Sequence, residues 1–179
     1  MSNSTLTLLP AAVLTVSLCQ VALTDDNAAN LTKILNTAIE IAETDDTFKA
    51  FAYLQSQGEP IVVAGHYSSV FRKVHREEKD VPLMVMFGRA GISYSLEQAR
   101  VAEKTDEDAA NKLKGYAKSI AYNLGANTWP GWNDKGIFID NSSKKAGLDA
   151  ARLNLRLAID LKRNDEVLGN AHWWSALSL

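Results

Sequence analysis

The chain has 179 residues, a formal net charge of −2 at pH 7, 46% hydrophobic residues and 22% charged residues. This is the composition of a globular chain long enough to bury its own core, and it excludes a disordered polypeptide. The acidic balance does not favour nucleic acid as a partner, and the single cysteine, Cys19, excludes an intramolecular disulfide. We therefore expect one folded domain over residues 1–179, with no nucleic acid bound.

The first 24 residues carry no charged side chain, and Leu6–Leu23 is mostly apolar. That length approaches a membrane span, but Pro10 and Gln20 interrupt it. A signal peptide requires a positively charged residue before its apolar run, and no lysine or arginine precedes this one. We expect residues 1–24 to be a buried first element of a cytoplasmic protein. The alternatives are a targeting segment, with export of the protein, or a membrane anchor over residues 5–23.

Hydrophobic periodicity predicts helices along most of the chain, and no stretch gives a convincing set of strands. Several of these stretches follow aspartates that are typical helix N-caps, such as Asp25 or Asp26 and Asp45 or Asp46. The expected helices span residues 11–23, 30–43, 47–57, about 66–79, 106–124, 147–163 and 166–179.

Three stretches are harder to interpret. Residues 11–23 alternate partly, which leaves a strand as an alternative to a helix. Ile61–Val63 is strand-like, so we expect the next helix to begin near His66, which would cap it. Residues 82–104 are expected to hold two helices, or one that is interrupted near Gly91.

The stretch "NTWPGWND" (127–134) holds two of the four tryptophans, separated by Pro-Gly. Proline followed by glycine is typical of a type II turn, and Gly125 is well placed to end the preceding helix. Such a turn puts Trp129 and Trp132 on the same side of a bend. Two interpretations follow: the indoles seal a groove between helices, or they form an aromatic wall for a peptide, sugar or other ligand.

Small and large residues alternate in a characteristic way along the second half of the chain. The positions concerned are Met84, Phe87, Gly88 and Ala99, then Ala151, Leu155 and Ala158, and finally Trp174 and Leu177. This spacing over roughly residues 80–179 resembles the tetratricopeptide repeat (TPR) family, whose unit is a helix pair of about 34 residues. The resemblance implies an all-α fold of stacked antiparallel helical hairpins, a TPR-like α-solenoid or α-α superhelix that binds proteins or peptides.

Motifs for nucleotide binding, serine hydrolysis and zinc proteolysis are all absent from the sequence. No catalytic residue, cofactor or metal site is therefore indicated, and the sequence leans away from an enzyme. An enzyme or small-ligand protein remains the alternative, with a pocket near Trp129, Trp132, His172 and Trp174. That alternative predicts a deep cavity and a histidine with a perturbed pKa.

The favoured hypothesis is a scaffold that binds a protein or peptide partner in a groove between the helices of residues 84–124 and 147–179. Arg152 and Arg156 lie four apart and could present charge to an acidic peptide, although exposed ion pairs are the simpler role. The sequence stops on "HWWSALSL" (172–179) without a helix stop signal. We therefore expect Trp173 and Trp174 to lie on an apolar face that self-associates or packs on a missing C-terminal neighbour.

A third interpretation follows from the same ending. The chain would then be a truncated, structural fragment of a larger repeat protein, with no activity of its own.

Overall fold

A computed structural model describes the backbone of residues 15–177 and the side chains of residues 27–173. The chain divides into two compact units, Met1–Lys33 and Ile34–Leu179. The described part contains seven α-helices and no strand, which confirms the all-α prediction. The helices are α1 Thr15–Thr44, α2 Thr47–Gln55, α3 Pro60–Lys73, α4 Val81–Ala102, α5 Glu107–Asn127, α6 Asn141–Asp160 and α7 Asp165–Leu177.

The first unit contributes one described element, the beginning of α1. This helix runs without interruption through Asp25 and Asp26, so the predicted break and N-cap at these aspartates are wrong. No helix in residues 15–177 has the length and apolarity that crossing a bilayer requires. The rest of the predicted first element, residues 1–14, lies outside the described residues, as do the side chains of residues 15–26.

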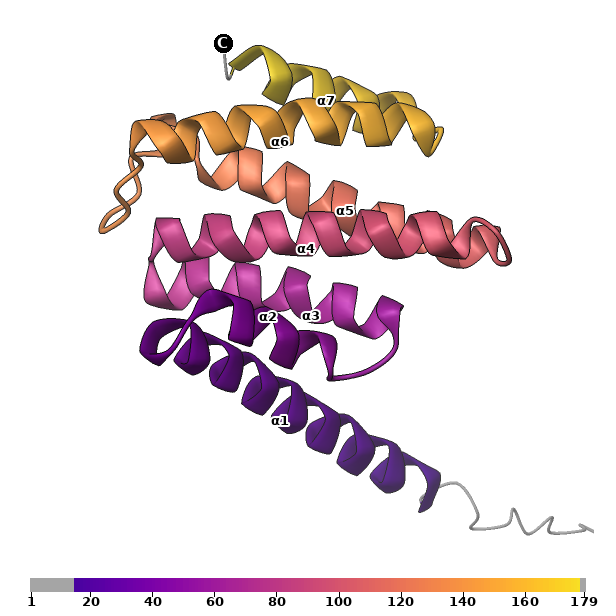
Figure 1. The fold of residues 1–179 in the computed structure, drawn as a ribbon. Helices are drawn as coiled ribbons and strands as arrows, with labels where there is room; N and C mark the ends of the chain where they lie inside the picture. The colour runs from indigo at the N-terminus through magenta and orange to yellow at the C-terminus, as the bar shows by residue number, and fades with distance from the viewer. Residues whose placement is uncertain (1–14, 178–179) are drawn as a thin grey trace, which may run out of the picture. The chain divides into compact units, whose positions relative to one another are not determined.

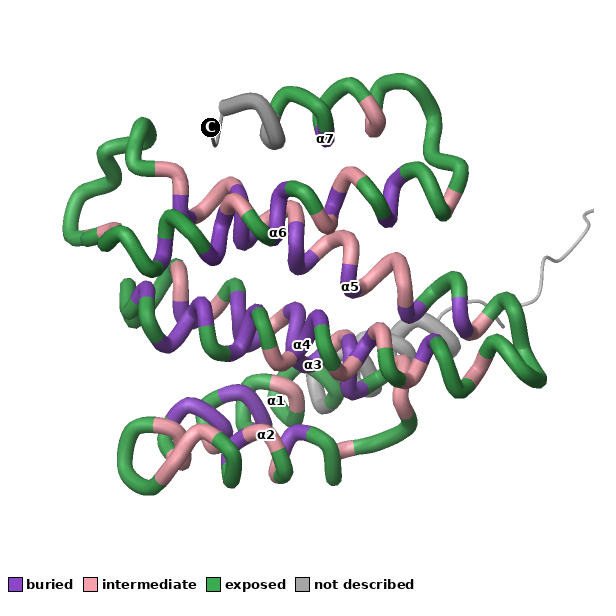
Figure 2. The backbone as a smooth tube through the Cα atoms, turned by 45° about the horizontal axis from the view of Figure 1, so that its top comes forward, coloured by how far each residue is buried: buried purple, intermediate pink, exposed green. Residues whose placement is uncertain are grey.

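In the second unit, consecutive helices pack against one another from α2 to α7 (Figure 1). Alternate helices also touch: α3 contacts α5 and α5 contacts α7, while α2 contacts α4 and α4 contacts α6. The helices of this unit therefore lie in two layers. Buried positions recur along α3 to α6 in Figure 2 and alternate with exposed ones, as amphipathic helices between two layers require.

Helix α4 lies close to its neighbours because two of its glycines leave room for large side chains. A Cβ atom on Gly91 would lie 2.8 Å from Tyr67 Cβ and 3.0 Å from Ile120 Cδ1, and one on Gly88 would lie 3.1 Å from the Phe71 ring. Tyr67 and Phe71 belong to α3, and Ile120 belongs to α5. The close contact of three helices thus depends on these two positions.

The predicted interruption at Gly91 is wrong, since α4 is continuous. Glycine inside a helix costs about 1 kcal/mol relative to alanine, but here it allows packing that a side chain would block. One consequence is that Met84, Phe87 and Ala99, which the repeat pattern assigned to two paired helices, lie on the same helix.

Aspartate side chains cap four of the helices. In each case a backbone N–H three residues on donates to the aspartate Oδ1 over 2.6–2.9 Å. The pairs are Lys49 with Asp46, Leu83 with Asp80, Ala109 with Asp106 and Ser143 with Asp140. The cap predicted at residues 45–46 and the helix start predicted at residue 106 are confirmed. Each cap satisfies an otherwise unpaired N–H and contributes roughly 1 kcal/mol to stability.

Three predicted boundaries differ from the structure. Helix α3 begins at Pro60 instead of near residue 66, because proline fits the first turn and burial of the apolar face outweighs the strand preference of Ile61–Val63. Helix α6 begins at Asn141 instead of residue 147, since Asp140 caps it. Helix α5 continues past Gly125 to Asn127, because Gly125 packs against Ala151 of α6.

The packing at Gly91 predicts the effect of a single methyl group. Gly91→Ala should lower the free energy of unfolding by about 1–3 kcal/mol, the usual cost of overpacking a filled core. The matched variant Gly169→Ala lies in α7, where a Cβ meets nothing within 4 Å, and should be neutral or slightly stabilising. Urea unfolding of both variants tests this, and equal stability of the two would contradict the packing role of Gly91.

Candidate functional site

The tryptophan corner between α5 and α6 is a short 3-10 helix, Pro130–Trp132, so the predicted type II turn is wrong. Gly131 keeps a negative φ, and Asn133 ends the turn in the left-handed region with a φ of 51°. The Trp129 and Trp132 rings meet edge to face with centroids 5.2 Å apart. A side chain on Gly131 would overlap the Trp129 ring, which explains the glycine.

Trp132 folds back onto the end of α5, where its Nε1–H donates to the Ala126 carbonyl over 2.9 Å. This bond adds a side-chain donor to a carbonyl at the end of α5 that also accepts a hydrogen bond from the Trp129 N–H over 3.2 Å. The Trp132 side chain is still 50% exposed, and most of the connection between α5 and α6 is exposed in Figure 2. The corner therefore closes the helix end without burying both indoles.

A cavity of about 180 Å³ lies between the two tryptophans and residues 137–139. Sites for small ligands usually measure about 300–1,000 Å³, so this one is small for a ligand site. His172 is exposed on α7 and does not line it, and the side chain of Trp174 lies outside the described residues. The structure thus does not bring His172 together with Trp129 and Trp132.

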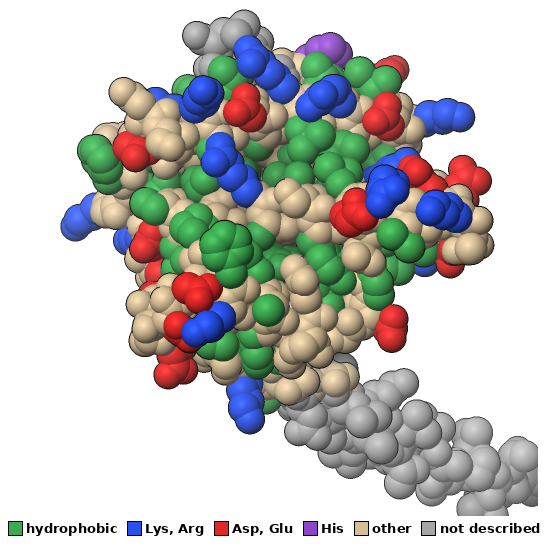
Figure 3. Space-filling view, in the orientation of Figure 1, with side chains coloured by type: hydrophobic (Ala, Val, Ile, Leu, Met, Phe, Trp, Pro, Cys, Tyr) green, Lys and Arg blue, Asp and Glu red, His purple; other side chains and the backbone are tan. Residues whose placement is uncertain are grey.

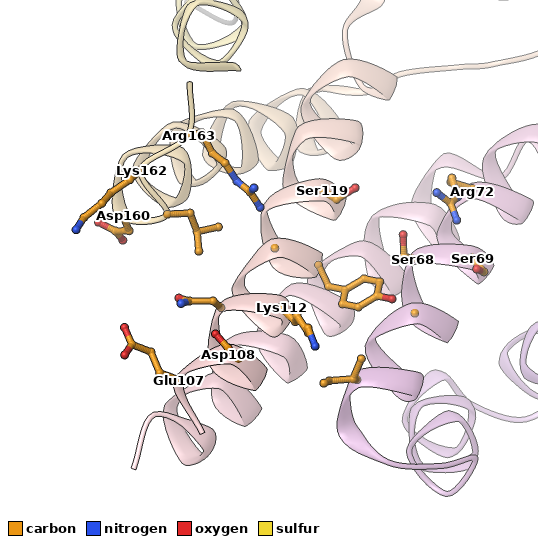
Figure 4. A pocket seen from close by; sticks show the side chains of 16 residues that line it. Ser68, Ser69, Arg72, Glu107, Asp108, Lys112, Ser119, Asp160, Lys162 and Arg163 are labelled. Carbon is orange, nitrogen blue, oxygen red and sulfur yellow. The ribbon is translucent and has the colours of Figure 1, made fainter. Parts of the chain in front are cut away.

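A larger, open groove of about 970 Å³ runs between α3, α5 and the C-terminal end of α6 (Figure 4). Helix α3 lines it with one face, through Ile61, Gly65, Ser68, Ser69 and Arg72. Helix α5 lines it through Glu107, Asp108, Asn111, Lys112, Gly115, Tyr116 and Ser119. Both sets recur every three to four residues, so each is one continuous helix face.

The floor of the groove is held by Tyr116, which reaches from α5 to α3. A Cβ atom on Gly65 would lie 3.4 Å from the Tyr116 hydroxyl oxygen. Tyr116 and Ile61 also pack on a buried cluster of Ala64, Ala99 and Leu113 from α3, α4 and α5. Because the cluster joins three helices below the groove, the two walls are fixed relative to each other.

The third side of the groove is formed by the turn after α6. Lys162 takes a left-handed backbone conformation with a φ of 48°, and the Arg163 N–H donates to the Ala158 carbonyl over 3.0 Å. This closure resembles a Schellman motif. The turn directs Arg163 back over α5, where its NH2 nitrogen lies 3.6 Å from the position of a Cβ on Gly115.

Charges of both signs line the groove, and Lys112, Lys162 and Arg163 come from the same part of it as the acidic residues. Glu107, Asp108 and Asp160 lie at the beginning of α5 and the end of α6, whereas Arg72 lies on α3 at the other side (Figure 4). Burial lowers the pKa of Lys118, which adjoins the groove on α5, and the positive charge of Arg163 lowers this pKa further.

The lining offers hydrogen bonding and charge pairing. Hydroxyl groups come from Ser68, Ser69, Ser119 and Tyr116, and an amide comes from Asn111. Neither histidine nor cysteine is among the lining residues. Within the part of the chain that the structure describes, no cluster of three or more His, Cys, Asp or Glu side chains could hold a metal ion. These groups would offer a polar ligand both hydrogen bonds and ion pairs.

The other residues singled out from the sequence lie elsewhere. Arg152 and Arg156 are exposed on α6 and do not line the groove, and Trp173 is 52% exposed on α7. On the face shown in Figure 3, charged side chains of both signs are interspersed around hydrophobic ones.

The sequence analysis did not identify the groove residues, because it used the spacing of apolar residues and not the spacing of the polar residues on the neighbouring helix faces. In residues 108–119, Asp108, Lys112, Gly115 and Ser119 recur at helical spacing, and this signal was available. The contribution of Arg163 could not be read in the same way, because it depends on how the turn after α6 closes.

Comparisons of the chain with protein-family models, with curated proteins and with solved structures found no match.

The Trp132 hydrogen bond gives a testable consequence. Trp132→Phe keeps an aromatic ring but removes the donor to the Ala126 carbonyl, so the free energy of unfolding should fall by about 1 kcal/mol. Phe138→Leu, a change of an aromatic side chain that is 82% exposed in the same connection, should cost less. Thermal or urea unfolding measures both. An equal effect of the two changes would contradict a capping role for Trp132.

His66 predicts a dependence of stability on pH. It is buried on α3 instead of capping it, its Nδ1 has no hydrogen-bond partner in the described part of the chain, and burial lowers its pKa. Burial also lowers the pKa of His75. As the pH falls, the unfolded chain binds protons at these histidines near pH 6.5, whereas the folded chain binds them only at lower pH. The folded state should therefore lose stability as the pH drops below about 6.5.

His66→Gln should reduce this loss of stability without abolishing it, because His75 remains. Urea unfolding at pH 7.5 and pH 5.0 measures the change for the wild-type chain and the variant. An identical pH dependence for the two proteins would show that His66 does not resist protonation in the folded state.

Proposed function

We propose that the chain is a TPR-like helical scaffold and that its groove between α3 and α5 binds an extended peptide segment of a protein partner. The observation that carries the proposal is the groove itself. It measures about 970 Å³, is open, and is walled by two helix faces that carry hydroxyl, amide and charged side chains. An extended segment can satisfy its own backbone groups against such side chains along the length of the groove.

The packing order of the helices supports the scaffold part of the proposal. Stacked helical hairpins place alternate helices in the same layer, and here α3, α5 and α7 touch in sequence, as do α2, α4 and α6. In this arrangement the groove-forming helices α3 and α5 belong to one layer. Ala151 and Ala158 of the repeat-like pattern are buried on α6, where Ala151 packs on Gly125 of α5.

Self-association through α7 is a second interaction that we propose for the same scaffold. Trp173 exposes about half of its side chain, and an exposed indole favours a contact that removes it from water. Light scattering over a broad concentration range tests this part. A strict monomer would contradict it and leave the groove unaffected.

Selection from a displayed library of random 12-residue peptides tests the groove. The immobilised full chain should enrich a set of peptides, and Ser69→Trp, which fills the groove from α3, should weaken the most enriched peptide at least about tenfold. Ser93→Trp places the same side chain on an exposed position of α4 outside the groove and should leave binding unchanged.

Circular dichroism verifies that both variants are folded, and Asn111→Trp, at an exposed position of the groove, replaces Ser69→Trp if that variant is not. Failure to enrich any peptide would contradict the proposed function. Equal binding by the blocked and control variants would show that the peptides bind elsewhere.

A further inference from the structure

Several cationic side chains in or beside the groove form no ion pair with a carboxylate in residues 27–173. Among them are Arg72 on α3, Lys118 on α5 and Arg163 in the turn after α6, together with Lys112 and Lys162. The ion pairs in this part of the chain use other cations: Lys49, Lys73, Arg100 and Lys114. Positive charge is therefore available here that no direct ion pair uses.

Arg163 is placed over a bare stretch of helix. Because Gly115 has no side chain, the guanidinium lies against the α5 backbone, and Ser119 is one turn further along the same helix (Figure 4). A guanidinium in this position keeps its fork of N–H donors for a planar anion, and a serine hydroxyl one turn away adds a further donor.

Lys118 increases the positive charge at the same place. It is next to Ser119 in the sequence and partly buried; burial lowers its pKa, and the positive charge of Arg163 lowers the pKa further. Two neighbouring positive charges repel each other. An anion that lies between them removes this repulsion, so binding of a carboxylate is favoured beyond a single ion pair.

The acidic residues of the groove favour an acidic peptide over a nucleic acid as the anionic partner. Glu107, Asp108 and Asp160 line the groove near the cations, and the chain has a net charge of −2. A nucleic acid carries phosphates along its whole length and would be repelled by this acidic part. A peptide with a few carboxylates can place them on the cations and put neutral or basic residues beside the acids.

We propose that Arg163 and Lys118, assisted by the Ser119 hydroxyl, bind an aspartate or glutamate carboxylate of the peptide, and that Arg72 across the groove binds a second one. The inference deepens the proposed function and depends on it. It assigns the partner as an acidic segment, with its basic or neutral part over the beginning of α5.

The composition of selected peptides tests the assignment. Peptides enriched by the wild-type chain should contain more Asp and Glu than the starting library, and this surplus should disappear when Arg163→Gln/Lys118→Gln is used for selection. The most enriched peptide, labelled with fluorescein, should bind about tenfold more weakly to each single variant by fluorescence anisotropy. That loss corresponds to one charge-assisted hydrogen bond.

Matched variants separate this effect from a general change of charge. Arg152→Gln and Arg156→Gln remove exposed arginines of α6 outside the groove and should leave the affinity within about twofold. Arg163→Lys should recover part of the lost affinity. A version of the peptide with Gln for each Glu should bind weakly to the wild-type chain and should not distinguish it from Arg163→Gln.

The outcomes are distinguishable. Enriched peptides that are neutral or basic, or that bind Arg163→Gln as tightly as the wild-type chain, would overturn the acidic assignment and leave the groove function standing. No enrichment at all would overturn both. Binding of a 12-nucleotide single-stranded RNA at 150 mM salt that is lost in Arg163→Gln would assign the cations to nucleic acid and contradict the proposal.

Discussion

The arrangement of the second unit depends on the contact between Tyr67 and Gly91. Tyr67 is fully buried, and its Cβ lies where any side chain at position 91 would have to be. The same tyrosine accepts a hydrogen bond from Gln55 Nε2 over 3.2 Å, so it also ties α2 to α3. Because α4 approaches both α3 and α5 at this point, the spacing of the two groove walls is determined below the groove itself.

The groove is a consequence of this packing and of small residues at its surface. Gly65 and Gly115 occur where α3 and α5 face the opening, and three serines, Ser68, Ser69 and Ser119, line the same two walls. Larger residues there would have closed the space between the two helices. The same absence of side chains lets Tyr116 span the floor and lets Arg163 lie over α5. Packing in the core and chemistry at the surface are thus linked through the same two helices.

Sequence reasoning succeeded where a local signal and the tertiary structure agree. The apolar stripe of residues 106–124 predicted a helix, and the aspartates at positions 45 and 46 predicted a cap, and the structure contains both. It failed where packing overrode the local signal, as at Gly91, where a glycine that weakens a helix in isolation allows three helices to meet. The type II turn predicted for the tryptophan corner was wrong for a similar reason. The position of Trp132 depends on its hydrogen bond to Ala126 at the end of α5, which the local sequence does not indicate.

The candidate site could be predicted only in part. The polar face of residues 108–119 is visible in the sequence, but which other helix faces it is not. Trp129 and Trp132 do lie together, but His172, Arg152 and Arg156 are on other elements, and none of these five residues lines the groove. The electrostatic environment of a groove side chain depends on residues that are distant in the sequence. Lys118 and Arg163 are 45 positions apart and interact only because α5 and α6 pack side by side.

The most direct test of the account is a map of where an enriched acidic peptide binds. Two-dimensional ¹H–¹⁵N NMR spectra of the labelled full chain, recorded during titration with the peptide, report on every backbone amide. The account predicts that shifts concentrate in residues 65–72, 111–119 and 160–163. Shifts confined to the tryptophan corner or to α7, with these three segments unchanged, would contradict it.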